Sequence, residues 1–398
     1  MKVVFVNPIG ELGGAERSLL DLAWSLKQED PSLELELLSL AKGPLTSAAR
    51  DLGVTAYELP LPASLQTLGE NEGLPLTALR TLLRAPAALS FGARLRRALA
   101  DAAPAIVHSN GLKAHALTAA VRPAGLALVW HMRDFLSARP LMRRLLPALR
   151  SRADAAIAIS EAVARDIRPL LGTLPVHVIL NGIRTQTFRR STIEPLDLDT
   201  LSELPRPPSG TVRVGMVATY AHWKGHDVFL DAASRISARN ARFYVVGGSI
   251  YSSQGSQLCE ALLRERIRQL GLESRCGLVP FQDDAASIYA ALDIVVHAST
   301  RPEPFGRTIA EAMASGCAVV AASEGGPTEQ IRSGEDGVLV KPHDAARLSQ
   351  ALSTLIESAS FRQRLAERAV VRATRDLDAT RLGPEVRAFY DRLLEERA

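Results

Sequence analysis

The chain has 398 residues, of which 47% are hydrophobic and 23% are charged, and its formal net charge is +4 at pH 7. This balance is typical of soluble globular proteins and argues against disordered and membrane-spanning classes, while the length predicts about two domains. The three cysteines lack CxxC spacing, and with no secretory signal and no apolar run of roughly 20 residues we expect a cytoplasmic protein without a disulfide framework or structural zinc.

Short runs rich in Val and Ile alternate with longer helical patterns, which is typical of βαβ units and parallel sheets. The strands predicted in the first half are 3–6, 35–40, 54–59, 105–108, 127–130, 155–159 and 176–180. The second half repeats the pattern at 212–217, 243–246, 277–279, 294–296, 318–321 and 338–340. The sequence therefore predicts an α/β protein with one parallel sheet in each half.

The stretch between the two halves is rich in proline and turn formers and has neither the helix nor the strand period, which is typical of a linker. We place an N-terminal domain at 1–185, the linker at 186–210 and a C-terminal domain at 211–375. The last residues, about 376–398, are predicted to form a charged helix with a break at Gly383–Pro384.

Two arginine-rich stretches, 73–100 and 135–153, each carry five Arg and no acidic residue. Because the arginines alternate with Leu and Ala, both stretches are predicted to be basic amphipathic helices. Such helices contact anionic lipid or an acidic acceptor, or they are ordinary solvated faces, and the sequence leaves both interpretations open. No aromatic residues are interleaved and no nucleic-acid motif is present, so we expect no nucleic-acid partner.

Polar or small residues follow most of the predicted strands. In doubly wound sheets ligands bind outside the carboxyl ends of the strands, so this is where functional side chains are expected. The residues at these positions are Asn7, His108, His131, Ser160, Asn181, Thr219, Gly247, His297, Ser299 and Ser323. Any single one is explained by a turn or a helix cap, but the whole set predicts a ligand site.

The stretch RPEPFGRTIAEAMASG follows a predicted strand and carries Glu303 and Glu311. The helix is predicted to open near Phe305, so Glu303 is predicted in the loop before it and Glu311 on the helix. Helical side chains lean toward the amino end, and Glu311 should therefore point back toward the loop. The alternative interpretation is that both glutamates only cap and solvate a helix start.

Amides at the start of this helix lack carbonyl partners within the helix, and with the helix dipole they form an anion site. Here they belong to Gly306, Arg307 and Thr308. A diphosphate suits these amides, and sugar or ribose hydroxyls suit the two carboxylates. The stretch therefore predicts a site for a nucleotide sugar.

The spacing of the two glutamates resembles the E-x7-E signature of retaining GT-B glycosyltransferases, most closely glycosyltransferase family 4. Further motifs match the family in order and spacing over nearly the whole chain. They are GGAE at 13–16, NGI at 181–183, WKGHDVFLDA from Trp223, EGGPTE at 324–329 and EDGVLVKPHD at 335–344.

The resemblance implies a GT-B fold, in which two Rossmann-like domains with parallel sheets face across a cleft and the C-terminal helix crosses back to the N-terminal domain. It implies retaining, metal-independent transfer of a sugar from a nucleotide-diphosphate donor, with a UDP- or GDP-sugar favoured. The acceptor is expected to be a hydroxyl of a glycan, glycolipid or lipid-linked precursor, with peripheral contact to the inner face of the cell membrane through the arginine-rich helices. No cofactor and no metal are expected.

The resemblance also assigns roles to residues of this sequence. The catalytic residues are expected to be His131, Lys224 and Glu303. Donor binding is expected from Gly13, Gly14, Thr219, Lys224, Gly247, Pro280, Glu303, Pro304, Phe305, Gly306, Arg307, Thr308 and Glu311. The acceptor side is expected to include Glu16, Asn110, Arg133 and Asp134.

One position departs from the family pattern. An arginine usually precedes the KG lysine, but Thr219 stands there, so half of the expected phosphate clamp is missing. We expect an active enzyme in which Lys224, with His222 or Arg307, carries the charge. Two other hypotheses are a nucleotide-sugar epimerase, which needs no acceptor, and a non-catalytic protein that binds nucleotide sugars.

Overall fold

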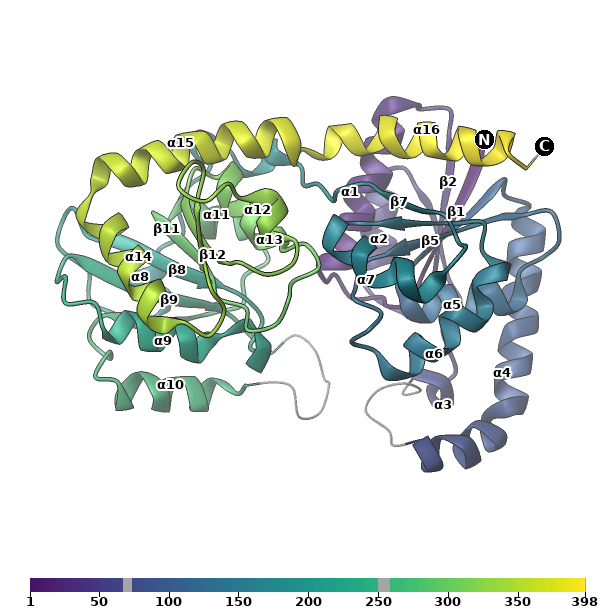
Figure 1. Ribbon diagram of the computed structural model, residues 1–398, viewed down its shortest axis with the longest axis horizontal. Coiled ribbons are helices and arrows are strands. Elements are labelled where there is room, and N and C mark those ends of the chain that lie inside the picture. Colours follow the sequence, from purple (N-terminus) through teal and green to yellow (C-terminus); the bar gives the residue numbers. More distant parts are fainter. Residues whose placement is uncertain (67–73, 250–257, 398) are drawn as a thin grey trace. The chain divides into compact units, whose positions relative to one another are not determined.

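The computed structural model describes residues 1–66, 74–249 and 258–397, and for residues 66 and 74–85 it describes the backbone only. It divides into two compact units, the first formed by residues 1–182 and 379–398 and the second by residues 183–378. Each unit is a parallel sheet with helices on its faces (Figure 1). The predicted α/β class with one parallel sheet in each half is confirmed.

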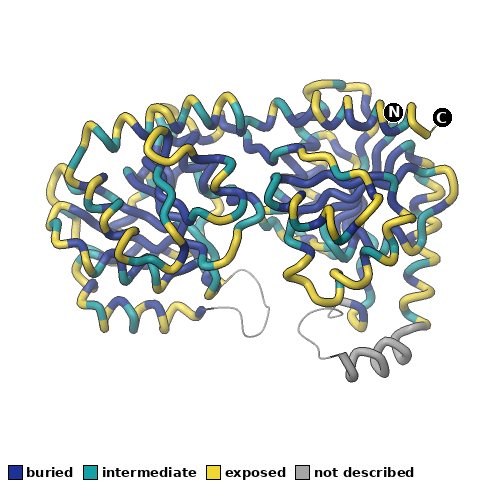
Figure 2. The backbone as a smooth tube through the Cα atoms, in the orientation of Figure 1, coloured by how far each residue is buried: buried dark blue, intermediate teal, exposed yellow. Residues whose placement is uncertain are grey.

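The first unit contains a seven-stranded parallel sheet in the order β3-β2-β1-β4-β5-β6-β7. Its central strands are buried on both faces, as expected when helices cover both sides of a parallel sheet (Figure 2). The strands are β1 (Lys2–Asn7), β2 (Glu34–Ser39), β3 (Thr55–Glu58), β4 (Ile106–Asn110), β5 (Ala127–Met132), β6 (Ala155–Ala158) and β7 (Val176–Val178).

The helices of the first unit alternate with these strands, and the last helix of the chain joins them. They are α1 (Gly14–Glu29), α2 (Leu45–Asp51), α3 (Ala63–Gln66), α4 (Leu74–Ala102), α5 (Leu112–Val121), α6 (Pro140–Leu149), α7 (Glu161–Leu171) and α16 (Leu382–Glu395), with short 3-10 turns at Arg150–Arg152 and Ala379–Arg381. Of the stretch predicted as a basic helix at 73–100, the first residue lies outside the described residues.

The C-terminal helix α16 packs on α1, which confirms the predicted return of the chain to the N-terminal domain. A Cβ at Gly383 would lie 2.4 Å from the carbonyl oxygen of Ser25, so only glycine permits this close approach. The amide of Gly383 also donates a hydrogen bond to Ser25 Oγ at 2.8 Å. Together these contacts hold the first turn of α16 against α1.

The sequence predicts a break in the C-terminal helix at Gly383–Pro384, but the break lies earlier in the chain. Helix α15 (Ala359–Asp376) ends before Leu377, and Gly383 and Pro384 lie within the first turn of α16. Proline is tolerated in a first turn because the amide it lacks would have no partner within the helix.

The second unit contains a six-stranded parallel sheet in the order β10-β9-β8-β11-β12-β13. Its strands are β8 (Val212–Val217), β9 (Ala241–Gly247), β10 (Cys276–Pro280), β11 (Ile294–His297), β12 (Ala318–Ala322) and β13 (Val338–Val340). Its helices are α8 (Leu198–Leu201), α9 (His226–Ser234), α10 (Glu260–Gln269), α11 (Ala285–Ala290), α12 (Arg307–Ala314), α13 (Pro327–Gln330), α14 (Ala345–Glu357) and α15, with 3-10 turns at Thr185–Phe188, Arg190–Thr192 and His222–Lys224.

The stretch 186–210, predicted as a linker, packs as part of the second unit. It is anchored by Asp199 on α8, which is only 3% exposed. Its carboxylate accepts hydrogen bonds from Arg213 at 2.7 Å, Arg242 at 2.9 Å and Tyr244 at 2.6 Å. The sequence pattern does not predict this anchor, because a single buried charge and its partners leave no repeating pattern.

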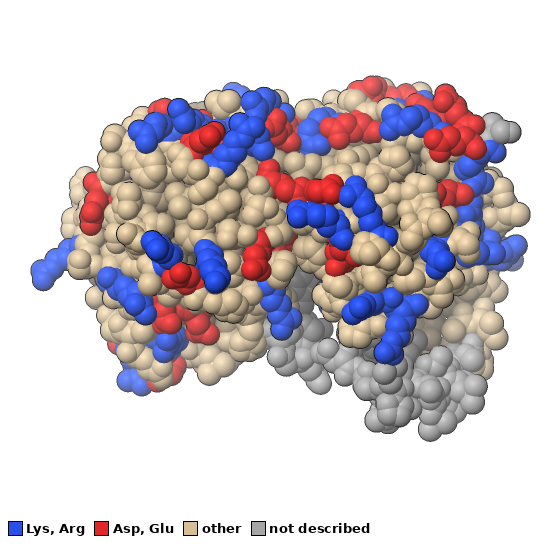
Figure 3. All heavy atoms as spheres, in the orientation of Figure 1, with Lys and Arg blue, Asp and Glu red and all other residues tan. Residues whose placement is uncertain are grey.

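Charged residues of both signs alternate along α15 and along α16 (Figure 3). Ion pairs one helical turn apart join Arg372 to Asp376, Arg381 to Glu385 and Arg387 to Asp391. The charged outer faces of these two helices are thus explained by pairing along the helix. In the part of the chain that the structure describes, every helix is too short or too polar to cross a bilayer.

Candidate active site

The loop between β11 and α12 carries Glu303, and glycines fix its course. Gly306 caps α12 with a φ of 90°, a left-handed conformation that glycine adopts without strain. A Cβ at Gly325 would lie 2.3 Å from the carbonyl oxygen of Glu303, and the amide of Gly326 donates to that oxygen at 2.8 Å. The backbone of Glu303 is therefore held firmly at the carboxyl edge of the sheet.

Lys224 reaches the same edge from the 3-10 turn His222–Lys224 after β8. The turn closes through Gly225, which has a φ of 80° and whose Cβ, if present, would lie 2.0 Å from the carbonyl oxygen of Ala298. Glycine is required here for both reasons. The KG pair thus sets the turn that aims the lysine.

One carboxylate oxygen of Glu303 collects three partners. Oε2 lies 2.7 Å from Lys224 Nζ, 3.2 Å from Ser299 Oγ and 3.3 Å from His297 Nε2. The other oxygen, Oε1, has no hydrogen-bond partner among residues 1–66, 74–249 and 258–397. It is therefore placed to accept a hydrogen bond from a ligand.

The pKa of Glu303 reflects two opposing effects. Burial raises it, but the charge of Lys224 and the hydrogen bond with His297 more than compensate. The net result is a pKa well below the ordinary value for glutamate. Glu303 is therefore ionised throughout the physiological range.

Glu311 lies on α12 and is 7% exposed. Its Oε1 accepts from Arg307 Nε at 3.2 Å, and its Oε2 accepts from the Tyr289 hydroxyl at 3.0 Å. Tyr289 comes from α11 and is fully buried. The carboxylate is therefore held in one orientation beside the first turn of α12, whose amides form an anion site.

Three of the expected donor residues lie at or just beyond neighbouring strand ends. Gly247 ends β9 and Pro280 ends β10, and the two are paired in register. A Cβ at Gly247 would lie 1.9 Å from the carbonyl oxygen of Ala218, so only glycine fits. Thr219 follows β8 and is half-buried, and its hydroxyl makes no hydrogen bond within the described part of the chain.

The remaining expected donor residues surround the start of α12. Pro304 and Thr308 are half-buried, whereas Phe305 is 2% exposed. The side-chain amide of Gln330 donates to the carbonyl oxygen of Phe305, which ties the loop to α13. Phe305 thus supports the loop from beneath and leaves its backbone near the anion site.

In the first unit, a row of polar side chains crosses the carboxyl edge of the sheet. Asn110 on β4 pairs in register with His131 on β5, and Asn7 ends the neighbouring strand β1. The amide of Asn110 donates to Asn7 Oδ1 at 2.6 Å, and that of Asn7 donates to Glu16 Oε1 at 3.3 Å. The row therefore links the sheet to α1.

Arg133, 8% exposed, binds several members of this row. Its guanidinium donates to Asn110 Oδ1 through Nε, to Asn181 Oδ1 at 3.3 Å and to His131 Nδ1 at 3.3 Å. Asn181 in turn donates to Ser18 Oγ at 2.9 Å. We call Arg133 and these hydrogen-bonded partners, Asn7, Glu16, Ser18, Asn110, His131 and Asn181, the Arg133 network.

His131 is 4% exposed and contacts the fully buried His108 through a ring nitrogen pair 2.9 Å apart. His108 contacts the hydroxyl of Tyr390 on α16 at 2.6 Å. Burial lowers the pKa of both imidazoles well below the ordinary value, and the charge of Arg133 lowers it further. Both rings are therefore neutral at physiological pH.

Gly13, Gly14 and Glu16 lie at the start of α1, where Gly13 is the extended N-cap. Glu16 is 4% exposed, and burial raises its pKa although Asn7 and Arg133 oppose the rise. Asp134 differs from the other expected acceptor residues. It caps the amide of Phe135 at 2.9 Å and pairs with Arg139 at 2.6 Å, outside the Arg133 network.

The expected residues therefore form two groups, one around Glu303 in the second unit and one around Arg133 in the first. Sequence reasoning missed Tyr289 and Tyr390, which hold Glu311 and His108. Both tyrosines lie in helical patterns with apolar neighbours, where they are indistinguishable from core residues. The individual roles given to the site residues stay predictions.

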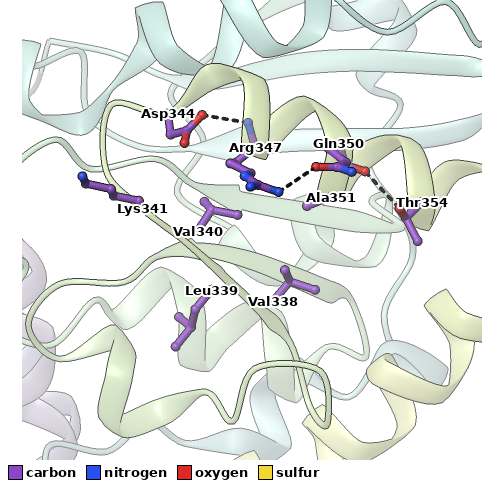
Figure 4. A pocket seen from close by; sticks show the side chains of 9 residues that line it. All are labelled: Val338, Leu339, Val340, Lys341, Asp344, Arg347, Gln350, Ala351 and Thr354. Atoms are coloured by element: carbon purple, nitrogen blue, oxygen red, sulfur yellow. Dashed lines mark hydrogen bonds between the residues drawn. The ribbon is translucent and has the colours of Figure 1, made fainter.

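A separate hollow of about 590 Å³ lies beside β13 and α14 (Figure 4). It is lined by Val338, Leu339, Val340, Lys341, Asp344, Arg347, Gln350, Ala351 and Thr354, none of which is an expected site residue. Asp344 caps α14 by accepting from the amide of Arg347 at 2.8 Å. Within the described residues, no three His, Cys, Asp or Glu side chains gather in a way that could hold a metal ion.

Two family models match the chain. The description "Glycosyltransferase Family 4" matches residues 12–187, and "Glycosyl transferases group 1" matches residues 201–372. The two matches follow the two units and leave only short segments outside them.

Curated relatives carry the same kind of name. A D-inositol 3-phosphate glycosyltransferase of Nocardia farcinica is 34% identical over 166 residues, which are 40% of this chain and 36% of that protein. The lipopolysaccharide core biosynthesis glycosyltransferase LpsE of Rhizobium meliloti is 26% identical over 215 residues, 54% of this chain and 57% of that protein. The chain thus matches between about one third and somewhat over half of the length of these relatives.

Among solved structures, Anabaena Alr3699/HepE in complex with UDP is 25% identical, with a TM-score of 0.79 over 98% of this chain and 100% of that chain. The same protein has also been solved in complex with UDP-glucose. With both units matched by family models and the whole fold shared with a UDP-bound structure, this chain belongs to glycosyltransferase family 4 and has the GT-B fold.

Proposed function

We propose that this protein transfers a sugar from a nucleotide-diphosphate donor to an acceptor hydroxyl with retention at the anomeric carbon. The observation that carries the proposal is the group formed by Lys224, Glu303 and the first turn of α12. A cation, an ionised carboxylate with one open oxygen and a helix start meet at the carboxyl edge of one sheet. These are the groups that a pyrophosphate and a sugar hydroxyl require.

In this proposal the first-turn amides of α12 bind the diphosphate, and Lys224 neutralises charge that grows on the departing phosphate. Lys224 Nζ already lies 2.7 Å from Glu303 Oε2. A small side-chain movement lets the ammonium contact both the carboxylate and a phosphate oxygen. Lys224 alone would then provide the positive charge that family members usually share between this lysine and an arginine at the position of Thr219.

Glu303 is proposed to accept a hydrogen bond from a sugar hydroxyl through Oε1. Its Oε2 is occupied by three partners and its pKa is low, so the carboxylate is a weak nucleophile. We therefore infer that Glu303 positions the sugar instead of forming a covalent intermediate. The acceptor proton would pass to an oxygen of the departing phosphate.

Glu311 is proposed to bind the ribose hydroxyls. Both of its oxygens already have donors, Arg307 and Tyr289, which keep the carboxylate oriented while it accepts further hydrogen bonds. We propose UDP as the nucleotide, because the structurally similar Anabaena protein binds UDP and UDP-glucose. We propose a polyol phosphate or an outer-envelope saccharide as the acceptor class, by analogy with the two curated relatives.

The acceptor side is proposed to include the Arg133 network together with Asp134, and membrane contact is proposed through α6. This helix exposes Leu141 and Leu145, each 36% accessible, and also the basic residues Arg143 and Arg144. Only Leu146 of the helix is buried. Apolar and cationic side chains on one exposed helix suit an anionic lipid surface on the cytoplasmic face of a membrane.

One experiment tests the proposal and separates it from its rivals. The protein is screened with UDP-, GDP- and ADP-sugars for thermal stabilisation, and nucleotide release is then measured with and without candidate acceptors. We expect UDP-sugar stabilisation and release of UDP that depends on an acceptor. Conversion of the donor without an acceptor would indicate an epimerase. Tight binding without turnover would indicate a binding protein, a function supported by the uncharged Thr219 at the position where the family usually has an arginine.

A further inference from the structure

Arg133 is the charged group that donates hydrogen bonds to His131 and to the side chains beside it. Guanidinium groups are permanently protonated and only donate hydrogen bonds. The guanidinium contacts His131 Nδ1 at 3.3 Å and also donates to Asn110 and Asn181. Because Nδ1 of His131 receives a donor, that nitrogen must carry a lone pair and not a proton.

This constraint passes along the chain of rings. His108 Nε2 lies 2.9 Å from the same His131 Nδ1, so His108 must donate from Nε2 and shares the one lone pair of that nitrogen with the guanidinium of Arg133. A neutral imidazole carries one proton, and His108 Nδ1 is then an acceptor. Tyr390 Oη lies 2.6 Å from it and therefore donates. Every hydrogen bond from Tyr390 to His131 points in one direction.

The remaining proton of His131 is then on Nε2. This nitrogen has no hydrogen-bond partner among the residues that the structure describes, and it lies in the polar row at the carboxyl edge of β5. We propose that Arg133 is a positioning residue that fixes His131 as the Nε2–H tautomer, so that the imidazole presents a hydrogen-bond donor and not a base. The use of that donor toward substrate rests on the proposed function.

The reverse arrangement shows why Arg133 is needed. If His131 carried its proton on Nδ1, it would donate to His108 Nε2, and His108 would donate to the hydroxyl of Tyr390. Without Arg133 the two arrangements have the same number of bonds between the rings. With Arg133 present, the reverse arrangement points an N–H group at a guanidinium, which is repulsive.

The tautomer can be read directly in the free protein by nitrogen NMR of histidine-labelled samples, since protonated and unprotonated ring nitrogens differ in chemical shift. The chain has eight histidines, and His131→Gln and His108→Gln samples assign the two signals. We expect both rings to be neutral Nε2–H tautomers in the wild-type protein and in Tyr390→Phe. In Arg133→Met we expect a mixture of tautomers at His131.

His115 provides an internal control, because its Nδ1 contacts Ser109 Oγ at 2.7 Å and not Arg133. Its signals should keep the same tautomer in all variants, which also reports that the fold is intact. An Nδ1–H tautomer at His131 in the wild-type protein would overturn the proposal. So would an unchanged pattern in Arg133→Met, or loss of the Nε2–H tautomer in Tyr390→Phe alone.

Transfer assays separate this proposal from the proposed function. Arg133→Met is expected to lower kcat/KM about tenfold, whereas Arg133→Lys, which retains a donor and the charge, should restore the tautomer and part of the rate. If the NMR pattern is as expected but the His131→Gln protein transfers sugar at the wild-type rate, the role of Arg133 stands and the substrate role of His131 is wrong.

Discussion

The pair formed by Lys224 and Glu303 should be coupled in both stability and catalysis. Their nitrogen and oxygen atoms are 2.7 Å apart, and the side chains are 22% and 17% exposed. Fully exposed pairs contribute about 0.2–1 kcal/mol, whereas breaking a buried pair costs about 3–5 kcal/mol. For this partly buried pair we expect Glu303→Gln to lower the free energy of unfolding by about 2 kcal/mol.

Lys224→Met should cost less, about 1 kcal/mol, because Ser299 and His297 still contact the Glu303 carboxylate. The double variant should be less destabilised than the sum of the single variants by about 1 kcal/mol, as expected for residues in direct contact. Urea titrations followed by circular dichroism give these values. A coupling energy below about 0.3 kcal/mol would contradict the reasoning.

A matched control exists in the first unit. Lys2 and Glu36 are also 2.7 Å apart, with side chains 25% and 19% exposed, but they join β1 to β2 away from the predicted site residues. Lys2→Met should change stability by a similar amount and leave transfer within twofold of wild type. Lys224→Met should lower kcat by about 100-fold, the effect of removing one group that stabilises a developing oxyanion. Lys224→Met with wild-type turnover would refute the catalytic role.

Three further predictions follow from particular contacts. Burial lowers the pKa of His226 to about 4, so the unfolded form binds protons more readily than the folded form. The stability of the second unit should therefore fall as the pH drops below about 6.5, by about 1.4 kcal/mol between about pH 8 and pH 5.5, and urea titrations of His226→Gln at these two pH values should lack this share of the pH dependence. An equal pH dependence in wild type and variant would contradict it. Tyr289→Phe should raise the KM for the nucleotide sugar about tenfold with little change in kcat, because the Glu311 carboxylate loses the hydrogen bond from the Tyr289 hydroxyl. An unchanged KM would show that Glu311 does not bind the ribose. The double variant Arg143→Gln, Arg144→Gln should bind vesicles containing anionic lipid about 30-fold more weakly, since each basic residue contributes about 1 kcal/mol. The control variant Arg264→Gln, Arg268→Gln on α10 should bind these vesicles like the wild-type protein. Equal sedimentation of all three proteins with the vesicles would contradict the membrane proposal.

Much of the fold could be predicted because parallel strands buried on both faces are continuous apolar runs. The return of the C-terminal helix to the N-terminal domain was implied by the family resemblance and is confirmed by the packing of α16 on α1. Residues 186–210, which were predicted to be a linker, pack with the second unit, and there Asp199 and its cationic partners stabilise a segment that has no periodic pattern. A buried charge cluster built from distant residues cannot be recognised by local spacing.

The candidate site was predictable where a motif carries its own geometry. Glu303 and Lys224 lie beside glycines that set their turns, and those glycines are visible in the sequence. The partners that orient the site were not predictable. His108 and Tyr390 are 282 residues apart, and they meet only because the chain returns to the first unit. The contacts of Arg133 likewise depend on the register of β4 and β5, which places Asn110 beside His131 and cannot be predicted from a local sequence pattern.

The central claim is that Lys224 binds the diphosphate while Glu303 binds the sugar. Calorimetric titration of UDP and of UDP-glucose into the wild-type protein, Lys224→Met and Glu303→Gln tests it most directly. We predict that Lys224→Met weakens both ligands by about tenfold or more, whereas Glu303→Gln weakens only UDP-glucose. Equal affinities of all three proteins for UDP-glucose would contradict the account.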